Sequence, residues 1–128
     1  MEAALTALLN GTAALTALTG TRFYWLRIPD SVSTYPAIVL TVVSFDETYR
    51  ADGASNLRRY VVQLDIYAET IADVVDVYDQ VEIALSGYGP TGALHQIVIE
   101  SVTDSNERRE DREYLFRRRV DLGIWHER

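Results

Sequence analysis

Few residues of this chain have the types and the spacing that catalysis or metal binding requires. A catalytic site needs a nucleophile with a base, a metal cluster or a cradle for phosphate. His95 and His126 are the only imidazole bases, and neither has a partner at the i+3 or i+4 spacing typical of zinc ligands. Cysteine is absent, which excludes thiolate nucleophiles, disulfides and cysteine zinc sites. We therefore expect no enzyme activity, no bound metal and no cofactor.

The acidic and glycine-rich segments have plain structural interpretations. Asp73, Asp76 and Asp79 recur at every third position on the outer face of a predicted amphipathic helix, and a solvated face accounts for them better than a metal site. The glycines between residues 87 and 92 precede neither a lysine nor a predicted helix. They therefore indicate a turn and not a phosphate-binding loop.

The balance of charge excludes a further class of function. Twelve basic residues against nineteen acidic ones give a net charge of −7, which repels phosphate backbones, so sequence-specific DNA binding is not expected. All twelve basic residues are arginine, which fits either a GC-rich genome or a protein interface rich in paired arginines. The N-terminus lacks the basic flank of a secretory signal, and the longest apolar run, Ala37–Val43, is too short for a membrane helix. We expect a mature chain in a reducing cytoplasm, with no membrane span.

Hydrophobic periodicity predicts the elements that must position these residues. Leucines at helical spacing predict a short helix over residues 2–9 and a second turn or two between Thr12, as N-cap, and Gly20. The i, i+3, i+4 pattern that follows Thr70 predicts the main helix, with Thr70 as its N-cap and Gly87 as its stop. Strands are predicted at residues 23–25, 38–45, 60–67, 94–102 and 114–125.

Two long polar segments join neighbouring strands. Asp46–Arg58 contains an Asp-Gly pair, and Thr103–Glu113 holds charges of both signs, so both are predicted to be hairpin loops. Strands joined mainly by hairpins indicate an α+β fold, a mostly antiparallel sheet of four to five strands covered by one long helix and a short N-terminal helix. We expect residues 1–128 to form a single domain.

Three consecutive arginines, Arg117, Arg118 and Arg119, lie inside the last predicted strand. Because side chains alternate along a strand, at least one of them points toward the apolar face. A buried arginine needs a carboxylate partner. That partner lies either in the same chain or in a neighbouring copy, and both alternatives stay open.

The order and spacing of several segments carry a resemblance that covers nearly the whole chain. These segments are the helical start at 2–9 with 13–20 and an aromatic strand, the opening Tyr35-Pro-Ala-Ile38, the strand Val62–Ala68 leading into Thr70 and a helix ending Ala84-Leu85, and the closing Tyr114–Arg119 with Val120–Trp125. Together they resemble the tail terminator (tail completion) proteins of long-tailed phages. None of these patterns is a catalytic signature, so no catalytic residues carry over.

The resemblance implies a structural virion protein. Such a subunit would form a ring, of six copies, that caps the finished tail tube and joins it to the head connector. Its partners would be other copies of itself, the tube protein and the connector protein, and DNA would pass through without specific binding. It would be assembled in the host cytoplasm and reside at the head-tail junction of a phage, a prophage or a gene-transfer-agent-like particle.

Candidate contact residues follow from the charged segments. We expect a subunit seam in which arginines near the second polar segment pair with the helix aspartates of an adjacent copy, namely Arg108, Arg109, Arg112 and Arg117 with Asp73, Asp76 and Asp79. The first polar segment would contact the tube or connector, through Asp46, Glu47, Tyr49, Arg50, Asp52 and Arg58. We expect both segments to become ordered only against neighbouring subunits.

An alternative from another class stays open. A small monomeric α/β module could hold a ligand or peptide against its sheet, with a binding face made of Trp25, Tyr49, Tyr60 and Tyr67. The mass of the protein in solution would discriminate a monomer from an assembling subunit.

Overall fold

The computed structural model of the protein describes residues 1–29, 34–50, 53–86, 88–89, 92–108 and 114–127. At 47–50, 53–56, 107–108 and 114 it describes the backbone and not the side chains. The elements follow one another as α1 (Glu2–Asn10), α2 (Ala13–Thr19), β1 (Phe23–Trp25), β2 (Ala37–Arg50), β3 (Gly53–Ala68), α3 (Ile71–Ser86), β4 (Leu94–Arg108) and β5 (Tyr114–Glu127).

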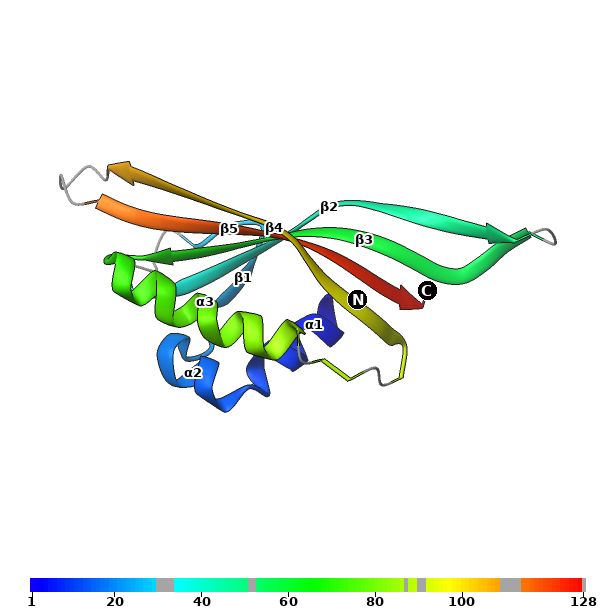
Figure 1. The fold of residues 1–128 in the computed structure, drawn as a ribbon, viewed down its shortest axis with the longest axis horizontal. Helices are drawn as coiled ribbons and strands as arrows, with labels where there is room; N and C mark the ends of the chain where they lie inside the picture. Colours follow the sequence, from blue (N-terminus) through cyan, green and yellow to red (C-terminus); the bar gives the residue numbers. More distant parts are fainter. Residues whose placement is uncertain (30–33, 51–52, 87, 90–91, 109–113, 128) are drawn as a thin grey trace.

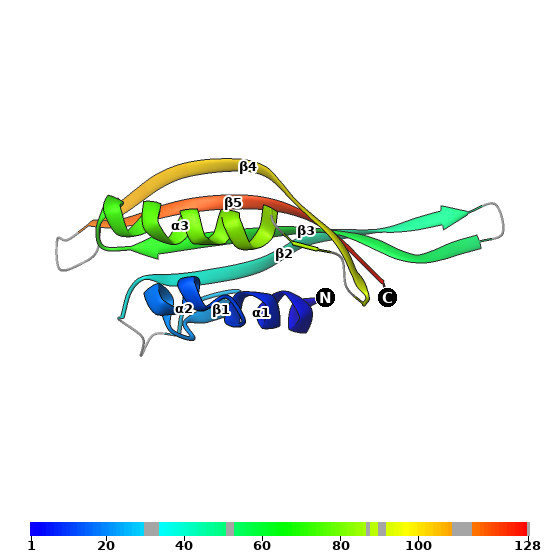
Figure 2. The same cartoon turned by 60° about the horizontal axis from the view of Figure 1, so that its bottom comes forward.

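The strands form one five-stranded sheet in the order β1-β2-β3-β5-β4. The pairs β2–β3, β3–β5 and β4–β5 are antiparallel, whereas β1 pairs with β2 in parallel, so the sheet is mixed. All three described helices lie on one face of it (Figures 1 and 2). The predicted α+β class and strand number are confirmed. The prediction that one long helix and one short N-terminal helix cover the sheet is corrected. Two short helices, α1 and α2, lie beside α3 on this face.

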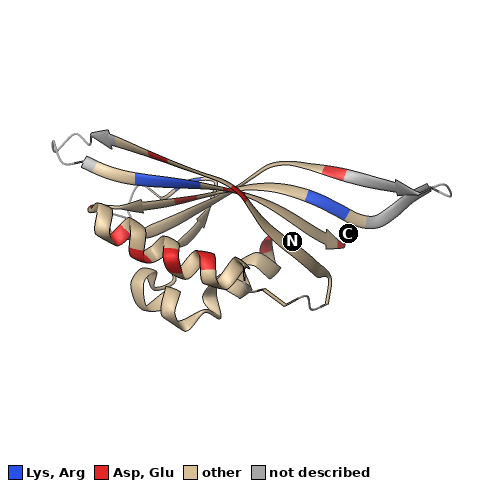
Figure 3. Ribbon diagram, in the orientation of Figure 1, with Lys and Arg blue, Asp and Glu red and all other residues tan. Residues whose placement is uncertain are grey.

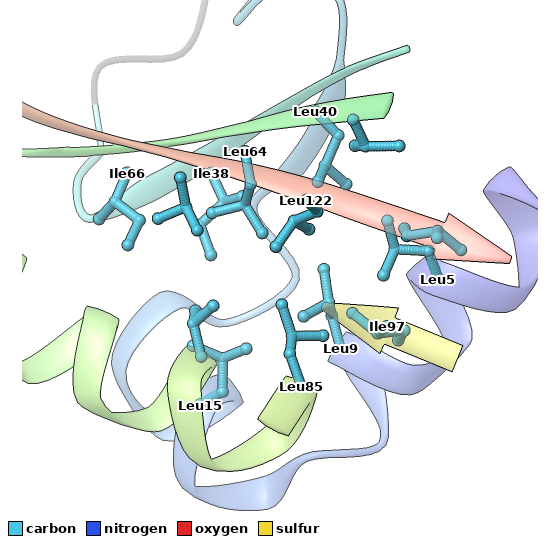
Figure 4. Packing of buried hydrophobic residues seen from close by; sticks show 14 of the residues in the cluster. Leu5, Leu9, Leu15, Ile38, Leu40, Leu64, Ile66, Leu85, Ile97 and Leu122 are labelled. Atoms are coloured by element: carbon cyan, nitrogen blue, oxygen red, sulfur yellow. The ribbon is translucent and has the colours of Figure 1, made fainter. Parts of the chain in front are cut away.

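Strict alternation along β3 decides which face is buried. Val62, Leu64 and Ile66 are fully buried on the helix face, as predicted for this strand. They pack against aliphatic side chains of the helices and of the neighbouring strands, among them Leu5, Leu9, Leu15, Ile38, Leu40, Val77, Leu85, Ile97 and Leu122 (Figure 4). Each fully buried side chain of this kind stabilises the fold by about 1.5–3 kcal/mol.

Local hydrogen bonds explain where the helices begin and end. The Thr70 hydroxyl accepts the backbone N–H of Asp73 at 3.1 Å, which confirms Thr70 as the N-cap of α3. Thr12 precedes α2 as predicted, but its hydroxyl donates to the Leu8 carbonyl at 2.9 Å instead of capping α2. Gly20 ends α2 with a positive φ of 61°, a conformation that favours glycine. The predicted stop of α3, at residue 87, lies outside the described residues.

The two predicted loops are largely strand, which corrects the sequence interpretation. Within Asp46–Arg58, β2 continues to Arg50 and β3 starts at Gly53; within Thr103–Glu113, β4 continues to Arg108. We call residues 44–50 with 53–60 the β2–β3 arm, and residues 103–108 with 114–117 the β4–β5 arm. The C-terminal ends of β2 and β4 lie at opposite ends of the long axis of the molecule (Figures 1 and 2).

Candidate interaction surfaces

The sheet face opposite the helices, the open face, carries a network of polar and charged side chains. Odd-numbered residues of β3 point to it, and the register of β5 places its odd-numbered residues beside them. Asp65 lies next to Arg119, Gln63 next to Asp121, and Tyr67 next to Arg117. Because no described helix covers this face, charged side chains occupy it and pair with one another.

Asp65 is the most buried charged group of the open face. It is only 4 % exposed, and one of its carboxylate oxygens accepts Arg117 Nε at 3.1 Å. The other oxygen accepts Gln63 Nε2 at 2.9 Å, and the Arg117 guanidinium lies 6.0 Å from the centre of the Tyr67 ring. The carboxylate that Arg117 requires therefore comes from the same chain.

Arg118 points to the opposite, helix-bearing side of the sheet. Its Nε and Nη2 donate to the two carboxylate oxygens of Asp104 at 2.7 and 3.1 Å, a bidentate pair between β5 and β4. These hydrogen bonds lower the pKa of Asp104 and raise the pKa of Arg118. The guanidinium also lies 5.0 Å from the centre of the Tyr78 ring on α3, and burial, followed by the charge of Glu82, raises the pKa of that phenol.

Arg119 returns to the open face and completes the alternation. Its Nε lies 3.7 Å from Asp121 Oδ1 and has no hydrogen-bond partner among the described residues. Asp121 instead accepts the hydroxyl of Ser101 at 2.7 Å. All three consecutive arginines thus lie beside a carboxylate of their own chain, and pairing with a neighbouring copy stays a prediction.

A further ion pair on the open face crosses β5. Arg59 of β3 donates to the Glu100 carboxylate of β4, and its guanidinium lies 5.3 Å from the centre of the Trp125 ring. Gly123 lies beneath this pair, and a Cβ added there would overlap the Glu100 carboxylate. Glycine at this position therefore allows a side-chain bridge over the strand. Nothing in the sequence pattern pointed to it.

The structure describes only part of the predicted charged seam. Asp73, Asp76 and Asp79 are exposed on the outer face of α3 and form an acidic stripe along it (Figure 3). Arg117 lies on the other face of the sheet, paired with Asp65, and does not approach the stripe within the chain. The side chain of Arg108, and all of Arg109 and Arg112, lie outside the described residues. Pairing between copies stays a prediction.

Five of the six residues predicted to contact a tube or connector belong to strands of the β2–β3 arm. Asp46 is exposed and lies opposite Arg59, and Arg58 lies over the Phe45 ring, 4.9 Å from its centre. Glu47, Tyr49 and Arg50 are in β2, with backbone described and side chains outside the described set; Asp52 lies outside it altogether.

The aromatic binding face expected for a monomeric module is not present as one surface. Tyr60 belongs to the buried core, only 8 % exposed, and Trp25 packs on the helix side, where its indole N–H donates to the Thr6 hydroxyl at 3.0 Å. Tyr67 lies on the open face. The side chain of Tyr49 is not among those described. The described members of this predicted site are therefore divided between two faces.

Exposed large apolar side chains lie on α3 (Ile71, Val75 and Ile83), after β1 (Leu26) and at two borders of the sheet, and sequence reasoning missed those at the borders. Val43 and Phe45 on β2 are 57 and 50 % exposed, and Val102 on β4 is 41 % exposed.

In the part of the chain that is described, no cluster of His, Cys, Asp or Glu could hold a metal ion. None of the described helices has the length and apolar character needed to cross a bilayer.

Comparisons with known proteins agree with an assembling subunit. The sequence matches the family described as tail completion protein gp17 over residues 3–127, and no curated protein matches it. A chain from a structure described as the virion of a native gene transfer agent (GTA) particle shares the fold. The TM-score is 0.67 and the identity 18%, and the match covers 98% of this chain and 94% of that chain. The protein thus belongs to the tail completion protein gp17 family, and it is a structural protein of the virion tail.

Proposed function

We propose that this chain forms a ring, of six copies, that ends the growth of the tail tube and joins the tail to the head connector. The observation that carries this proposal is the match to a tail completion family over residues 3–127, which is nearly the whole chain. The chain acts as one domain over residues 1–128, by fitting against other subunits and not by catalysis. It is assembled in the host cytoplasm and then resides at the head-tail junction.

The shape of the subunit supports a role between two partners. The β2–β3 arm and the β4–β5 arm extend toward opposite ends of the long axis, so one subunit can reach two different neighbours (Figure 1). Exposed Asp46 and half-buried Arg58 of the first arm are candidates for contact with the tube or connector, as are Glu47, Tyr49, Arg50 and Asp52. The aspartates of α3 remain candidates for pairing with Arg108, Arg109, Arg112 and Arg117 of an adjacent copy.

The net charge supports a channel through which DNA passes. A chain with a charge of −7 repels phosphate backbones, so a ring of such chains surrounds DNA without gripping it. The division of the aromatic residues between two faces weighs against the monomeric binding module.

Deleting the protein from its particle tests the proposal. We expect filled heads with tails that are unjoined or of uncontrolled length, because nothing then stops the tube or presents the docking surface. Electron microscopy gives the distribution of tail lengths and the fraction of joined particles. The matched control is the same deletion supplied with the intact protein in trans. Normal, infectious particles in the absence of the protein would contradict the proposal.

A further inference from the structure

The sheet has two borders where backbone groups face no strand among the described residues. One is the outer side of β4, which ends the strand order. The other is β2 beyond Leu40, because β1 pairs only with Ile38, Val39 and Leu40. We call Thr41–Asp46 the β2 edge and Leu94–Val102 the β4 edge. The Leu94 carbonyl accepts the Tyr88 hydroxyl at 2.7 Å, and the rest of each edge leaves N–H and C=O groups available to a further strand.

The two edges lie at the same level along the strands, at opposite borders of the sheet. Following the register across β3 and β5 places Thr41 in the same row as Ser101, and Phe45 in the same row as Ile97. A neighbouring copy placed beside this one therefore brings its β4 edge level with the β2 edge. A rotation about an axis along the strands achieves this without a shift along that axis.

Strand direction also matches at such a junction. The pairs β2–β3, β3–β5 and β5–β4 are each antiparallel, so β4 runs opposite to β2 within one copy. A copy related by rotation about an axis along the strands keeps these directions. Its β4 edge therefore meets the β2 edge in the antiparallel sense, and the alternation of directions continues from one copy to the next.

The composition of the two edges favours pairing with a further strand, because it lacks most of the features that prevent such pairing. Proteins commonly protect edge strands with lysine, proline, bulges or short length. Neither edge contains lysine or proline, and β4 is 15 residues long. The β2 edge has one bulge, between Val42 and Ser44. The β4 edge has two irregularities, between Leu94 and Gln96 and between Ile99 and Ser101, and the segment from Gln96 to Ile99 between them is regular. The exposed residues Val43, Phe45 and Val102 would be covered by a neighbouring strand.

We propose that adjacent copies join by pairing the β2 edge of one with the β4 edge of the next, antiparallel, so that one sheet continues around the ring. The occupant of each edge is a second copy, because every chain carries both complementary halves. A head-to-tail contact of this kind closes into a ring when the rotation between copies closes. This inference rests on the proposed ring and names its seam.

Engineered disulfides test the seam directly, because the chain contains no cysteine. Ser44 lies on the open face of the β2 edge, and Gln96, Val98 and Ser101 lie on the same face of the β4 edge. The variants are Ser44→Cys combined in turn with Gln96→Cys, Val98→Cys or Ser101→Cys. Within one copy three strand spacings separate the edges, about 14 Å, whereas a disulfide needs Cα atoms within about 7 Å. Any disulfide formed must therefore join two copies.

Oxidation of assembled particles should give a ladder of linked copies, up to the closed ring, for at least one of the three pairs. The control pair is Ser44→Cys with Ala17→Cys, an exposed position of α2 that should give no ladder. Electron microscopy of the same particles separates the two possible failures. A ring at the head-tail junction with no ladder from any pair overturns the edge pairing alone. Particles without a ring overturn the proposed function, and the seam with it.

A pair of single variants tests the seam without oxidation. Val43→Lys introduces a charge at the β2 edge, and Ile83→Lys introduces the same charge on α3 at a position of similar exposure, 66 against 57 %. Lysine at an edge opposes strand addition, so we expect Val43→Lys to reduce joined particles by about tenfold or more relative to Ile83→Lys. Circular dichroism should show both variants folded. Equal yields of joined particles from the two folded variants overturn the inference.

Discussion

Asp65→Asn removes one charge from the buried polar network of the open face and leaves the shape of the side chain almost unchanged. Asp65 is 4 % exposed and accepts hydrogen bonds from Arg117 and Gln63. In the variant the guanidinium of Arg117 loses its carboxylate, and the neutral amide accepts a weaker bond. We expect the free subunit to remain folded but to be less stable.

The expected loss of stability follows from the burial of the two partners. Breaking a fully buried ion pair costs about 3–5 kcal/mol, and losing a hydrogen bond to a charged group costs about 1.5–3 kcal/mol. Because the Arg117 side chain is 31 % exposed, water can solvate part of it, which favours the smaller range. An unfolding entropy of about 2.1 cal/mol/K per residue converts each kcal/mol into about 4 °C for a chain of 128 residues. The melting temperature should fall by about 6–11 °C.

Urea and thermal unfolding of the free subunit, followed by circular dichroism, measure this loss. Asp76→Asn is the matched control, because Asp76 is exposed on α3 and its variant should stay within about 0.5 kcal/mol of the parent. The double variant Asp65→Asn with Arg117→Gln should be more stable than the sum of the single effects predicts. An unchanged midpoint for Asp65→Asn, or strictly additive effects, would refute the role given to this pair.

Three further variants probe the other parts of the fold in the same assay. Leu64→Ala should cost about 2–5 kcal/mol because Leu64 is fully buried, whereas Ile83→Ala, at an exposed position, should cost under about 0.5 kcal/mol. Thr70→Ala should cost about 1 kcal/mol by removing the N-cap of α3, and Thr70→Ser should restore most of it. Asp104→Asn should be less stable than the parent above pH 3.8, the ordinary pKa of the carboxyl. Arg118 lowers the pKa of Asp104 in the folded state, so this difference should disappear as the pH falls below that value.

Each of these variants has an outcome that contradicts its reasoning. Equal costs for the buried and exposed alanine variants would mean that the helix-facing side of β3 is not the core. A Thr70→Ser variant as unstable as Thr70→Ala would exclude the hydroxyl as the cap. A difference between the parent and Asp104→Asn that grows in acid would show that Asp104 is stabilised by something other than its charge.

The sequence predicts best where one face of an element is buried and the other is solvated. In α3 apolar residues recur at the helix period, and the helix was predicted with nearly correct bounds. In β3 the strand period predicted residues 60–67, and the structure extends the strand back to Gly53. The arms were predicted as loops because their residues are polar. In a two-stranded ribbon both faces contact water, so the hydrophobic alternation that identifies a strand is missing.

For contacts between distant strands, the sequence predicts the type of partner but not which residue supplies it. The run Arg117–Arg119 indicated that a carboxylate must lie nearby, but Asp65 is 52 residues away and the strand order determines the pairing. The same limit applies to the sheet edges. Val43 and Val102 look like ordinary strand residues in the sequence. Only the order β1-β2-β3-β5-β4, with a β1 of three residues, shows that both lie at open borders.

Cryo-electron microscopy of the intact particle tests the central claim most directly. The claim is that copies of this chain form a closed ring between the tail tube and the head connector. The reconstruction should place six copies at that junction, around an open channel. Finding the chain distributed along the tube, at the distal tip, or as single copies that form no ring would contradict it.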